Sequence, residues 1–316
     1  MLIVNNNDVK KHIYTSLRYY ILLNPIGLLE IHNDDKIYNE NEIEHFLYDI
    51  HEISELPKFK DILFGDPNST IGIVLQHGYI GSNIENLYLG SKLALIGYRV
   101  IIPLLPGHGK NYTALHQVNS TKWKKKTQTA IEFLKQEKSD RKIILIGHSI
   151  GGVINLQITS TRNDIAAVCT ISSPFTYPKI VHLAAKLISS IYPNLLIKYR
   201  MFKFYDKKLS QHPYVKYLRK YYGVVTIKSL KDVIELLEET KNCLKKIKSP
   251  VLIIQSELDS TIYLNSGFNI KKFLGSKQKY LIYLKKSYHL GIIDTDRENV
   301  FQLILQFFNI TGLLLK

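Results

Sequence analysis

The stretch KIILIGHSIGGVINL, residues 142–156, places a serine between glycines where an apolar strand gives way to an apolar helix. In this context the pattern G-x-S-x-G is typical of a nucleophile elbow, a sharp turn that presents a serine hydroxyl above a sheet. Strand and helix pass close together there, so small residues are needed two positions either side of Ser149, and Gly147 and Gly151 meet that need. The alternative is an ordinary strand–turn–helix that happens to contain a serine. The stretch therefore predicts a parallel α/β sheet with Ser149 as a candidate nucleophile.

Apolar runs that suit buried parallel strands alternate with amphipathic helices along much of the chain. Strands are expected to begin near residues 71, 98, 142, 165, 250 and 279, and helices are expected at 88–97, 121–136, 151–162 and 297–308. This alternation predicts an α/β fold with a mostly parallel central sheet and helices on both faces.

Two regions depart from that alternation. Residues 1–67 are mixed and polar, and the turn cluster GDPNST that follows Phe64 marks a natural boundary. We therefore expect an N-terminal extension of unknown role at 1–67 and the α/β domain at 68–316. Between residues 175 and 247 the strand signal stops in a basic, aromatic segment of helical character, which is predicted to be inserted into the sheet domain.

Composition narrows the classes of protein that remain. The chain of 316 residues carries a formal net charge of +15, but it contains no zinc-finger spacing or aromatic ribonucleoprotein motif, so nucleic-acid binding is not expected. Its only cysteines, Cys169 and Cys243, predict no disulfide framework and fit a reducing cytosol. The apolar run at 19–29 is interrupted by Asn24 and Pro25 and is short of the roughly 20 residues that span a bilayer. We expect a cytoplasmic protein.

A serine nucleophile needs a base, and the base needs an orienting carboxylate. At an elbow of this kind the partners follow in the order Ser, acid, His. Asp259 comes directly after the apolar run VLIIQSEL, and His289 follows the run KYLIYL. Both stand at the carboxyl ends of predicted strands, where open sheets place their sites. They are the predicted acid and base.

Other histidines and carboxylates fit these roles less well. His148 is expected to point away from the site at the sharp turn and to be structural, and His77 and His108 precede the inserted segment. Asp294 and Asp296 follow His289, which breaks the expected order, and they could cap the last helix instead.

The glycine loop HGYIGS at 77–82 follows the first strong strand. Backbone amides at such a position, together with the amide after the nucleophile, can stabilise the oxyanion of an acyl-transfer reaction. The predicted donors are the N–H groups of Tyr79 and Ile150, and Gly78 allows the backbone to approach the substrate closely. An ordinary tight turn is the alternative for this loop, and PGHGKN at 106–111 is read as a shaped loop near the site.

Five pieces taken together resemble the α/β-hydrolase superfamily, and more narrowly bacterial carboxylesterases and monoacylglycerol lipases of the serine aminopeptidase-like group. These pieces are VLQHGYIGS, VIIPLLPGHGKN, IILIGHSIGG, PVLIIQSELDSTI and SYHLGIIDTDRENV. The resemblance implies an α/β-hydrolase fold and a Ser149/Asp259/His289 triad with backbone oxyanion donors. It also implies that 175–247 is a cap and that acyl esters are cleaved without a metal or organic cofactor. Isoleucine after the serine, where relatives often have methionine or leucine, is a mild departure.

Three questions stay open at this stage. The same scaffold could serve as an acyltransferase, thioesterase, peptidase or C–C bond hydrolase, because cap and pocket select the substrate. It could also be a catalytically inactive binding protein. Residues 176–249 carry 16 Lys and Arg against 5 Asp and Glu, which fits either weak contact with an anionic lipid surface or simply a solvated lid.

Overall fold

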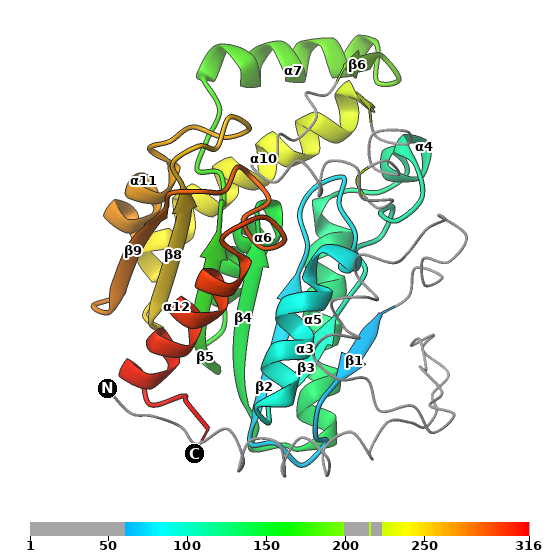
Figure 1. The fold of residues 1–316 in the computed structure, drawn as a ribbon. Helices are drawn as coiled ribbons and strands as arrows, with labels where there is room; N and C mark the ends of the chain where they lie inside the picture. The colour runs from blue at the N-terminus through cyan, green and yellow to red at the C-terminus, as the bar shows by residue number, and fades with distance from the viewer. Residues whose placement is uncertain (1–60, 199–214, 216–222, 316) are drawn as a thin grey trace.

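The structure is a computed structural model that describes residues 61–198, 215 and 223–315. Its centre is a seven-stranded sheet of order β1-β3-β2-β4-β5-β8-β9, in which strands far apart in the sequence lie side by side (Figure 1). The strands are β1 (Ile62–Phe64), β2 (Ile71–Gln76), β3 (Arg99–Ile102), β4 (Lys142–His148), β5 (Ile165–Ile171), β8 (Val251–Ser256) and β9 (Lys279–Leu284).

All neighbouring strands of this sheet are parallel except β1 and β3, which are antiparallel. Every residue of β2, β3 and β8 is buried, as is all of β4 except its first residue. Strands covered on both faces need apolar side chains on both sides, which is why their sequences read as continuous apolar runs. The prediction of a mostly parallel central sheet is confirmed.

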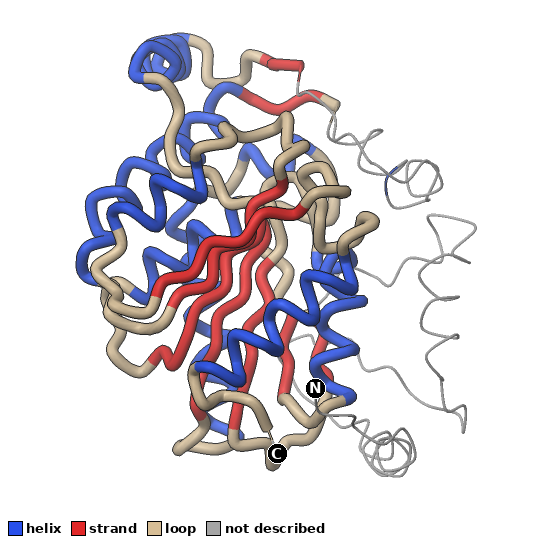
Figure 2. Tube along the Cα trace, turned by 60° about the vertical axis from the view of Figure 1, so that its left-hand side comes forward, coloured by secondary structure: helices blue, strands red, loops and turns tan. Residues whose placement is uncertain are grey.

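Helices cover both faces of the sheet (Figure 2). On one face α3 (Leu87–Leu95) packs against α12 (Arg297–Ile310), and on the other α6 (Ile150–Thr159) contacts both α5 (Ser120–Glu137) and α10 (Ile227–Cys243). The amphipathic pattern of α5 explains its position, because its fully buried residues recur on one side while its lysines face outward. Those buried residues are Trp123, Thr127, Ile131 and Leu134.

Several short elements of the structure were not predicted from the sequence. The turn η2 (Asn83–Asn86) precedes α3, α4 (Tyr112–His116) follows the loop after β3, and α11 (Ser266–Phe273) lies between β8 and β9. Strand β1 pairs with β3 through Leu63 and Ile101. The sheet thus begins before the boundary expected at residue 67; the rest of that extension, residues 1–60, lies outside the described part.

The segment between β5 and β8 leaves the sheet and returns to the neighbouring strand. Its described part contains α7 (Lys179–Ile191), α10 and the turn η3 (Leu244–Lys246), as the helical pattern predicts. It also contains an antiparallel ribbon of β6 (Leu196–Lys198) and β7 (Val224–Thr226), which that pattern did not predict. A small apolar cluster of Ala185, Ile227 and Ile234 ties α7 to α10.

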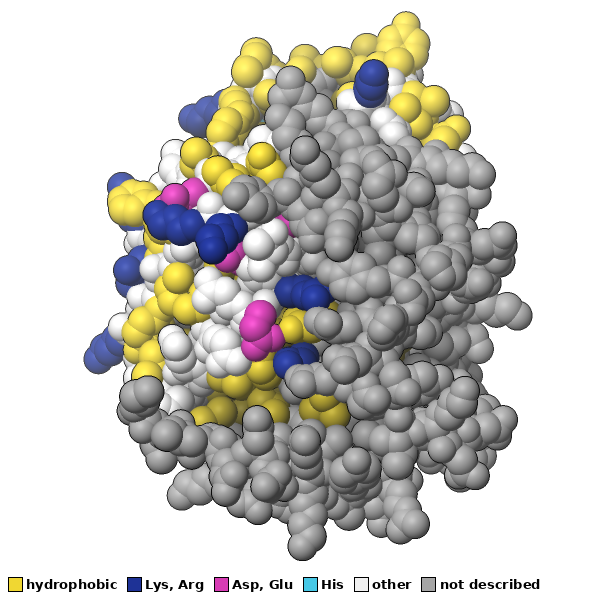
Figure 3. Space-filling model, in the orientation of Figure 1, with side chains coloured by type: hydrophobic (Ala, Val, Ile, Leu, Met, Phe, Trp, Pro, Cys, Tyr) yellow, Lys and Arg dark blue, Asp and Glu magenta, His cyan; other side chains and the backbone are white. Residues whose placement is uncertain are grey.

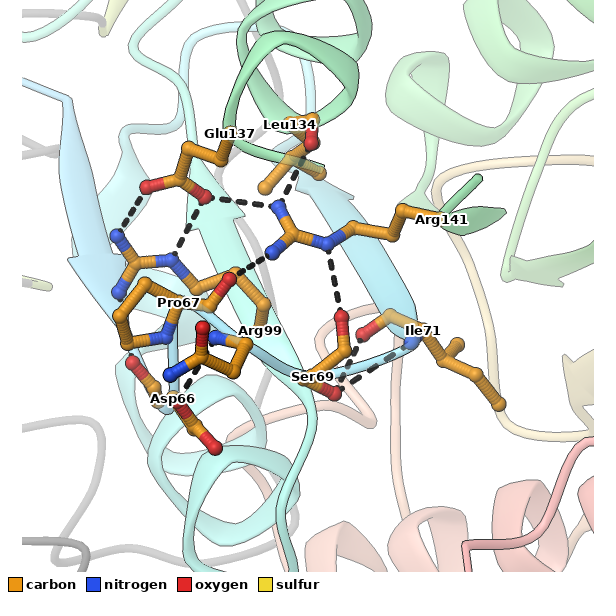
Figure 4. Close-up of polar contacts among 10 residues, drawn as sticks. Asp66, Pro67, Ser69, Ile71, Arg99, Leu134, Glu137 and Arg141 are labelled. Atoms are coloured by element: carbon orange, nitrogen blue, oxygen red, sulfur yellow. Dashed lines mark hydrogen bonds and ion pairs between the residues drawn. The ribbon is translucent and has the colours of Figure 1, made fainter. Parts of the chain in front are cut away.

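A network of charges closes the end of the sheet at which β2, β3 and β4 begin (Figure 4). The Arg141 side chain is fully buried and donates to the carbonyls of Pro67, Ser69 and Leu134 and, at 2.8 Å, to Glu137. Arg99 donates to the same Glu137 carboxylate at 2.5 and 3.0 Å. The turn before β2 is thereby fastened to the end of α5.

Within the described residues, no helix has the length and apolarity that crossing a membrane requires. Cys169 in β5 is buried and Cys243 at the end of α10 is half-buried, and both are free thiols.

Candidate active site

Ser149 stands between the end of β4 and the start of α6. Its backbone has φ 52° and ψ −121°, a conformation that costs a non-glycine residue on the order of 1–3 kcal/mol. The amide of Ser149 donates to the carbonyl of Ile171 at 2.8 Å, which anchors the turn to β5. The strain is therefore held by the surrounding strands, and the side chain remains slightly accessible, with 9% of the residue exposed.

The flanking glycines are required by close approach of backbone. A Cβ added at Gly147 would collide with the backbone of Gly151 and Gly152, and one at Gly151 would lie 2.6 Å from the carbonyl oxygens of Gln76 and His77. A Cβ at Gly78 would lie 3.1 Å from His148 Nδ1 and 3.2 Å from Ser149 Cβ. These positions let α6 start directly against the ends of β4 and β2.

His289 lies in the loop after β9 and contacts both other candidates. Its Nε2 is 3.0 Å from Ser149 Oγ, and its Nδ1 is 2.7 Å from Asp259 Oδ2. Because a carboxylate only accepts, Nδ1 carries the proton, and Nε2 of the neutral ring is left to accept the serine hydroxyl proton. The geometry brings together the three residues expected from the sequence, in the tautomer that a general base requires.

Asp259 is oriented by the loop that follows β8. Its Oδ1 accepts the amides of Thr261 at 2.8 Å and Ile262 at 3.2 Å, which leaves Oδ2 directed at His289. Burial raises the pKa of the Asp259 carboxyl, but its electrostatic interaction with the His289 ring and these hydrogen bonds together outweigh burial, so its pKa is lowered overall. The carboxyl is thus held as a carboxylate.

Asp294 and Asp296 brace the histidine loop. The amide of Tyr288 donates to Asp294 Oδ2 at 3.0 Å, and the amide of Lys286 donates to Asp296 Oδ2 at 2.9 Å. Asp296 occupies the N-cap position of α12, but its side chain makes no capping hydrogen bond. The possibility that Asp296 caps the helix through its side chain is therefore not realised, and the hydrogen bonds of both carboxylates include amides of the histidine loop.

The two expected oxyanion donors come from the elbow and the glycine loop. Ile150 is the first residue of α6, and the backbone N–H of a first helical residue has no acceptor within its own helix. Tyr79 follows β2, and its hydroxyl donates to Ser229 Oγ of α10 at 2.8 Å. The loop is thus fastened to the inserted segment. The amide of Gly78 has a partner of its own, Glu85 Oε1 at 2.7 Å.

The three remaining histidines near the site are buried. His77 Nε2 accepts the amide of Leu105 at 3.0 Å and Nδ1 donates to the carbonyl of Gly78 at 2.9 Å, so the ring is neutral, and burial lowers its pKa. His108 packs edge-on against His77 and Trp123, and burial places its pKa well below the ordinary value.

His148 differs, because it pairs with a carboxylate. Its Nδ1 is 2.9 Å from Glu85 Oε1, and its Nε2 is 3.0 Å from the carbonyl oxygen of His289. A structural role was expected for His148, but its partner Glu85 was not predicted from the sequence. Its signal in the sequence is faint: a single acidic residue seven positions after Gly78, on what reads as the approach to a helix.

Within the described part of the chain, no group of three or more His, Cys, Asp or Glu side chains is arranged to hold a metal ion.

Comparison with known families decides the classification, because the sequence profile of the serine aminopeptidase S33 family matches residues 68–296. The chain belongs to this family of α/β-hydrolases.

Individual relatives of this S33 hydrolase fit that assignment. It is 28% identical over 241 residues to the thermostable monoacylglycerol lipase of Bacillus sp. (strain H-257), covering 76% of this chain and 91% of the relative. It is 25% identical over 235 residues to a carboxylesterase of Bacillus subtilis (strain 168), covering 74% and 91%. Among solved structures, the monoacylglycerol lipase of Paleococcus ferrophilus superposes with a TM-score of 0.65 at 20% identity, over 79% of this chain and 98% of the other, which shows the shared fold.

Proposed function

We propose that the protein is a serine hydrolase that cleaves carboxylic esters, with short- or medium-chain acyl esters or monoacylglycerols as substrates. The observation that carries the proposal is the hydrogen-bonded chain from Ser149 Oγ through His289 to Asp259, at 3.0 and 2.7 Å. The lipase and carboxylesterase relatives support the ester class of substrate.

In the first half of the proposed reaction, Ser149 Oγ attacks the ester carbonyl carbon and its proton passes to His289 Nε2. Asp259 stabilises the imidazolium that forms, and the amides of Tyr79 and Ile150 donate to the oxyanion. When the intermediate collapses, the C–O bond to the alcohol breaks and His289 returns the proton to the leaving oxygen. Ser149 is left as an acyl ester.

In the second half, His289 takes a proton from water as the water oxygen attacks the acyl carbon. The tetrahedral intermediate breaks its bond to Ser149 Oγ, which regains a proton from His289, and the carboxylic acid departs. Every proton is carried by side chains already in contact, so the steps involve neither a metal nor an organic cofactor.

Turnover of p-nitrophenyl butyrate by the wild type and by Ser149→Ala tests the proposal. We expect the variant to fold and to lose hydrolysis; hydrolysis at the wild-type rate would refute Ser149 as the nucleophile. A graded series of acyl esters and monoacylglycerols then identifies the preferred acyl length.

Other reactions of the acyl-enzyme are the alternatives. An acyltransferase would pass the acyl group to an added alcohol or thiol, a thioesterase would prefer acyl thioesters, and a peptidase would cleave aminoacyl anilides. A binding protein without catalysis would show none of these activities. Product analysis with each substrate class distinguishes them.

We further propose that residues 175–247 form a cap over this site within the catalytic domain 68–316, to which β1 is added. The insertion point supports this, because the segment leaves from the carboxyl end of β5, the edge of the sheet that carries Ser149. Contacts from α10 also support it: Lys228 Nζ donates to the carbonyls of His116 at 2.9 Å and Val118 at 3.2 Å.

Weak contact with an anionic lipid surface is proposed for the outer side of this cap. Exposed apolar residues recur on one face of α7 and continue over β6, and hydrophobic side chains gather there in Figure 3. The most exposed of them on α7 are Ile180 (71% exposed), Leu183 (55%), Leu187 (57%) and Ile191 (68%). Lys179 and Lys186 fall at the edge of this face by helical spacing. An apolar stripe bordered by lysines suits the boundary between acyl chains and anionic headgroups. The other part of the basic segment, including YRMFKFY, lies mostly outside the described residues.

A further inference from the structure

Glu85 and His148 form a buried charged cluster that the proposed reaction steps do not use. Each is 1% exposed, Glu85 on the turn η2 and His148 at the end of β4, next to Ser149. Burying an unpaired carboxylate would cost much free energy, so the partners of Glu85 must compensate for its lost hydration.

The hydrogen bonds of this pair determine its charge. Nε2 of His148 faces a carbonyl oxygen, which only accepts, so Nε2 carries a proton. Nδ1 of the same ring faces Glu85 Oε1, and one proton lies between them. The Gly78 amide donates to that same oxygen at 2.7 Å, which favours the carboxylate and leaves the proton on the imidazole. The pair is therefore an imidazolium with a carboxylate.

The direction of each pKa agrees with this reading. Burial lowers the pKa of His148, yet Glu85 and the hydrogen bonds outweigh burial, and the pKa is raised overall. Burial raises the pKa of Glu85, yet His148 outweighs it, and the pKa is lowered overall. Among the neighbouring titratable groups, Asp259 favours the imidazolium of His148 and His77 favours the carboxylate of Glu85, while the His289 ring lies 5.0 Å from that of His148.

The pair touches each of the three segments that would have to meet for catalysis. Glu85 holds Gly78, the neighbour of Tyr79; His148 directly precedes Ser149; and Nε2 of His148 holds the backbone of His289 itself. Space for the carboxylate is provided by Gly81, where an added Cβ would collide with Glu85 Oε2. The pairing of β2 with β4, which reaches Gln76 and Gly147, already sets the first two segments side by side. In the described sheet β9 pairs with neither of these strands, so His148 supplies the contact to the loop of His289.

We propose that Glu85 and His148 are positioning residues, whose buried ion pair fixes the oxyanion loop, the serine elbow and the catalytic-histidine loop relative to one another. The proposal rests on the proposed function, because only an acyl-transfer reaction requires these three segments in register. Neither residue touches the reacting atoms, so their effect is on geometry.

Glu85→Gln is the informative substitution, because Glu85 Oε1 accepts hydrogen bonds from both the Gly78 amide and His148 Nδ1. If the amide oxygen of the introduced glutamine replaces Glu85 Oε1, there are two cases. A neutral His148 that donates from Nδ1 has an unprotonated Nε2 facing the carbonyl of His289, whereas a charged His148 is buried without a counter-ion. If the amide nitrogen replaces that oxygen, the Gly78 amide faces another N–H. Each arrangement loses an interaction with a charged group, which corresponds to about a ten- to hundredfold effect.

We expect Glu85→Gln to lower kcat for p-nitrophenyl butyrate about ten- to hundredfold while KM stays within about twofold. Glu137→Gln is the matched control: it removes a partly exposed network carboxylate at the opposite end of the sheet, so stability should fall and kcat should not. In the double variant of Glu85→Gln with His148→Asn, both substituted side chains are neutral. Its kcat should therefore be no lower than that of whichever single variant, Glu85→Gln or His148→Asn, has the lower kcat.

A second measurement needs no altered carboxylate. In wild-type protein labelled with ¹⁵N-histidine, one buried ring should stay doubly protonated as pH rises past 6.5, the ordinary histidine pKa, and its signal should be missing from His148→Asn. A His148 ring that is already neutral below pH 6.5 would overturn the ion pair. Wild-type turnover that persists unchanged in Glu85→Gln would overturn the positioning role alone, whereas a folded wild type without turnover would overturn the proposed function.

Discussion

At the scale of single residues, hydrogen-bond partners decide which protons each histidine of the site carries. His77 accepts a backbone amide and is neutral, His148 faces two acceptors and is charged, and His289 lies between a carboxylate and a hydroxyl. Three rings of one residue type thus take three different roles within one site. The difference comes from their neighbours and not from the histidine itself.

Asp259→Asn tests the role assigned to the carboxylate. An amide at this position can donate to Nδ1 of His289 and so favour the wrong tautomer, and loss of a triad carboxylate in this way lowers kcat by about 10⁴-fold. Steady-state turnover of p-nitrophenyl butyrate measures the effect. A decrease of less than about tenfold would indicate that another residue orients His289.

The ion pair of Glu85 and His148 predicts a particular dependence of stability on pH. The lowered pKa of Glu85 gives a contribution that is complete above its ordinary value of 4.5 and is lost as pH falls through the lowered pKa. The raised pKa of His148 gives one that is complete below its ordinary 6.5 and is lost as pH rises through the raised pKa. The difference in Tm between wild type and Glu85→Gln should therefore be largest between about pH 4.5 and 6.5. A difference that does not change with pH would contradict the charged pair.

The three residues that meet in the hydrogen-bonded chain of the candidate site were found from the sequence because their signals are local. A serine between glycines, a carboxylate after one strand and a histidine after another each follow a recognisable apolar run. Glu85 could not be predicted, since its role depends on the approach of β4 and the His289 loop, which are distant in sequence. The contacts of Asp294 and Asp296 with the histidine loop were missed for the same reason: these loop amides are brought near only by the folded chain.

At the scale of elements, continuous apolar runs made the parallel strands predictable, whereas short pieces escaped. Strand β1 has only three residues and depends on β3 for its hydrogen bonds, and the β6–β7 ribbon lies in a segment whose apolar residues fit a helix equally well. Both are fixed by pairing and not by local pattern. The Arg141 network has a similar origin, because the turn before β2 and the end of α5 meet at one guanidinium.

Glu137→Gln tests how much that network stabilises the fold. Two guanidinium groups, one of them fully buried, would lose their charged acceptor, so the free energy of unfolding should fall by about 1–3 kcal/mol. Urea denaturation measures the change, with kcat unaffected. An unchanged midpoint would show that the carbonyl acceptors of Arg141 suffice.

At the scale of the whole molecule, the charge network lies where β2, β3 and β4 begin, and the candidate catalytic residues lie where β4, β8 and β9 end. Helices α7 and α10 of the inserted segment lie beyond the carboxyl ends of the strands (Figure 1). The apolar face of α7 lies on the outer side of that segment, so a lipid surface could be met without disturbing the sheet. The excess of positive charge in 176–249 favours an anionic surface.

Co-sedimentation with vesicles tests this contact. The wild type should bind vesicles that contain anionic lipid, less so at high salt, and Leu183→Ser with Leu187→Ser should weaken binding about tenfold or more. Ile310→Ser, which removes an equally exposed apolar residue at the far end of α12, is the control. Binding that depends on neither anionic lipid nor salt would contradict the electrostatic part of the proposal.

The central claim is that Ser149 is an activated nucleophile, and labelling with a fluorophosphonate followed by peptide mass spectrometry tests it most directly. The account predicts one modified residue per chain, Ser149, and no labelling in Ser149→Ala. A folded wild type that stays unlabelled, or that is labelled at another serine, would contradict it.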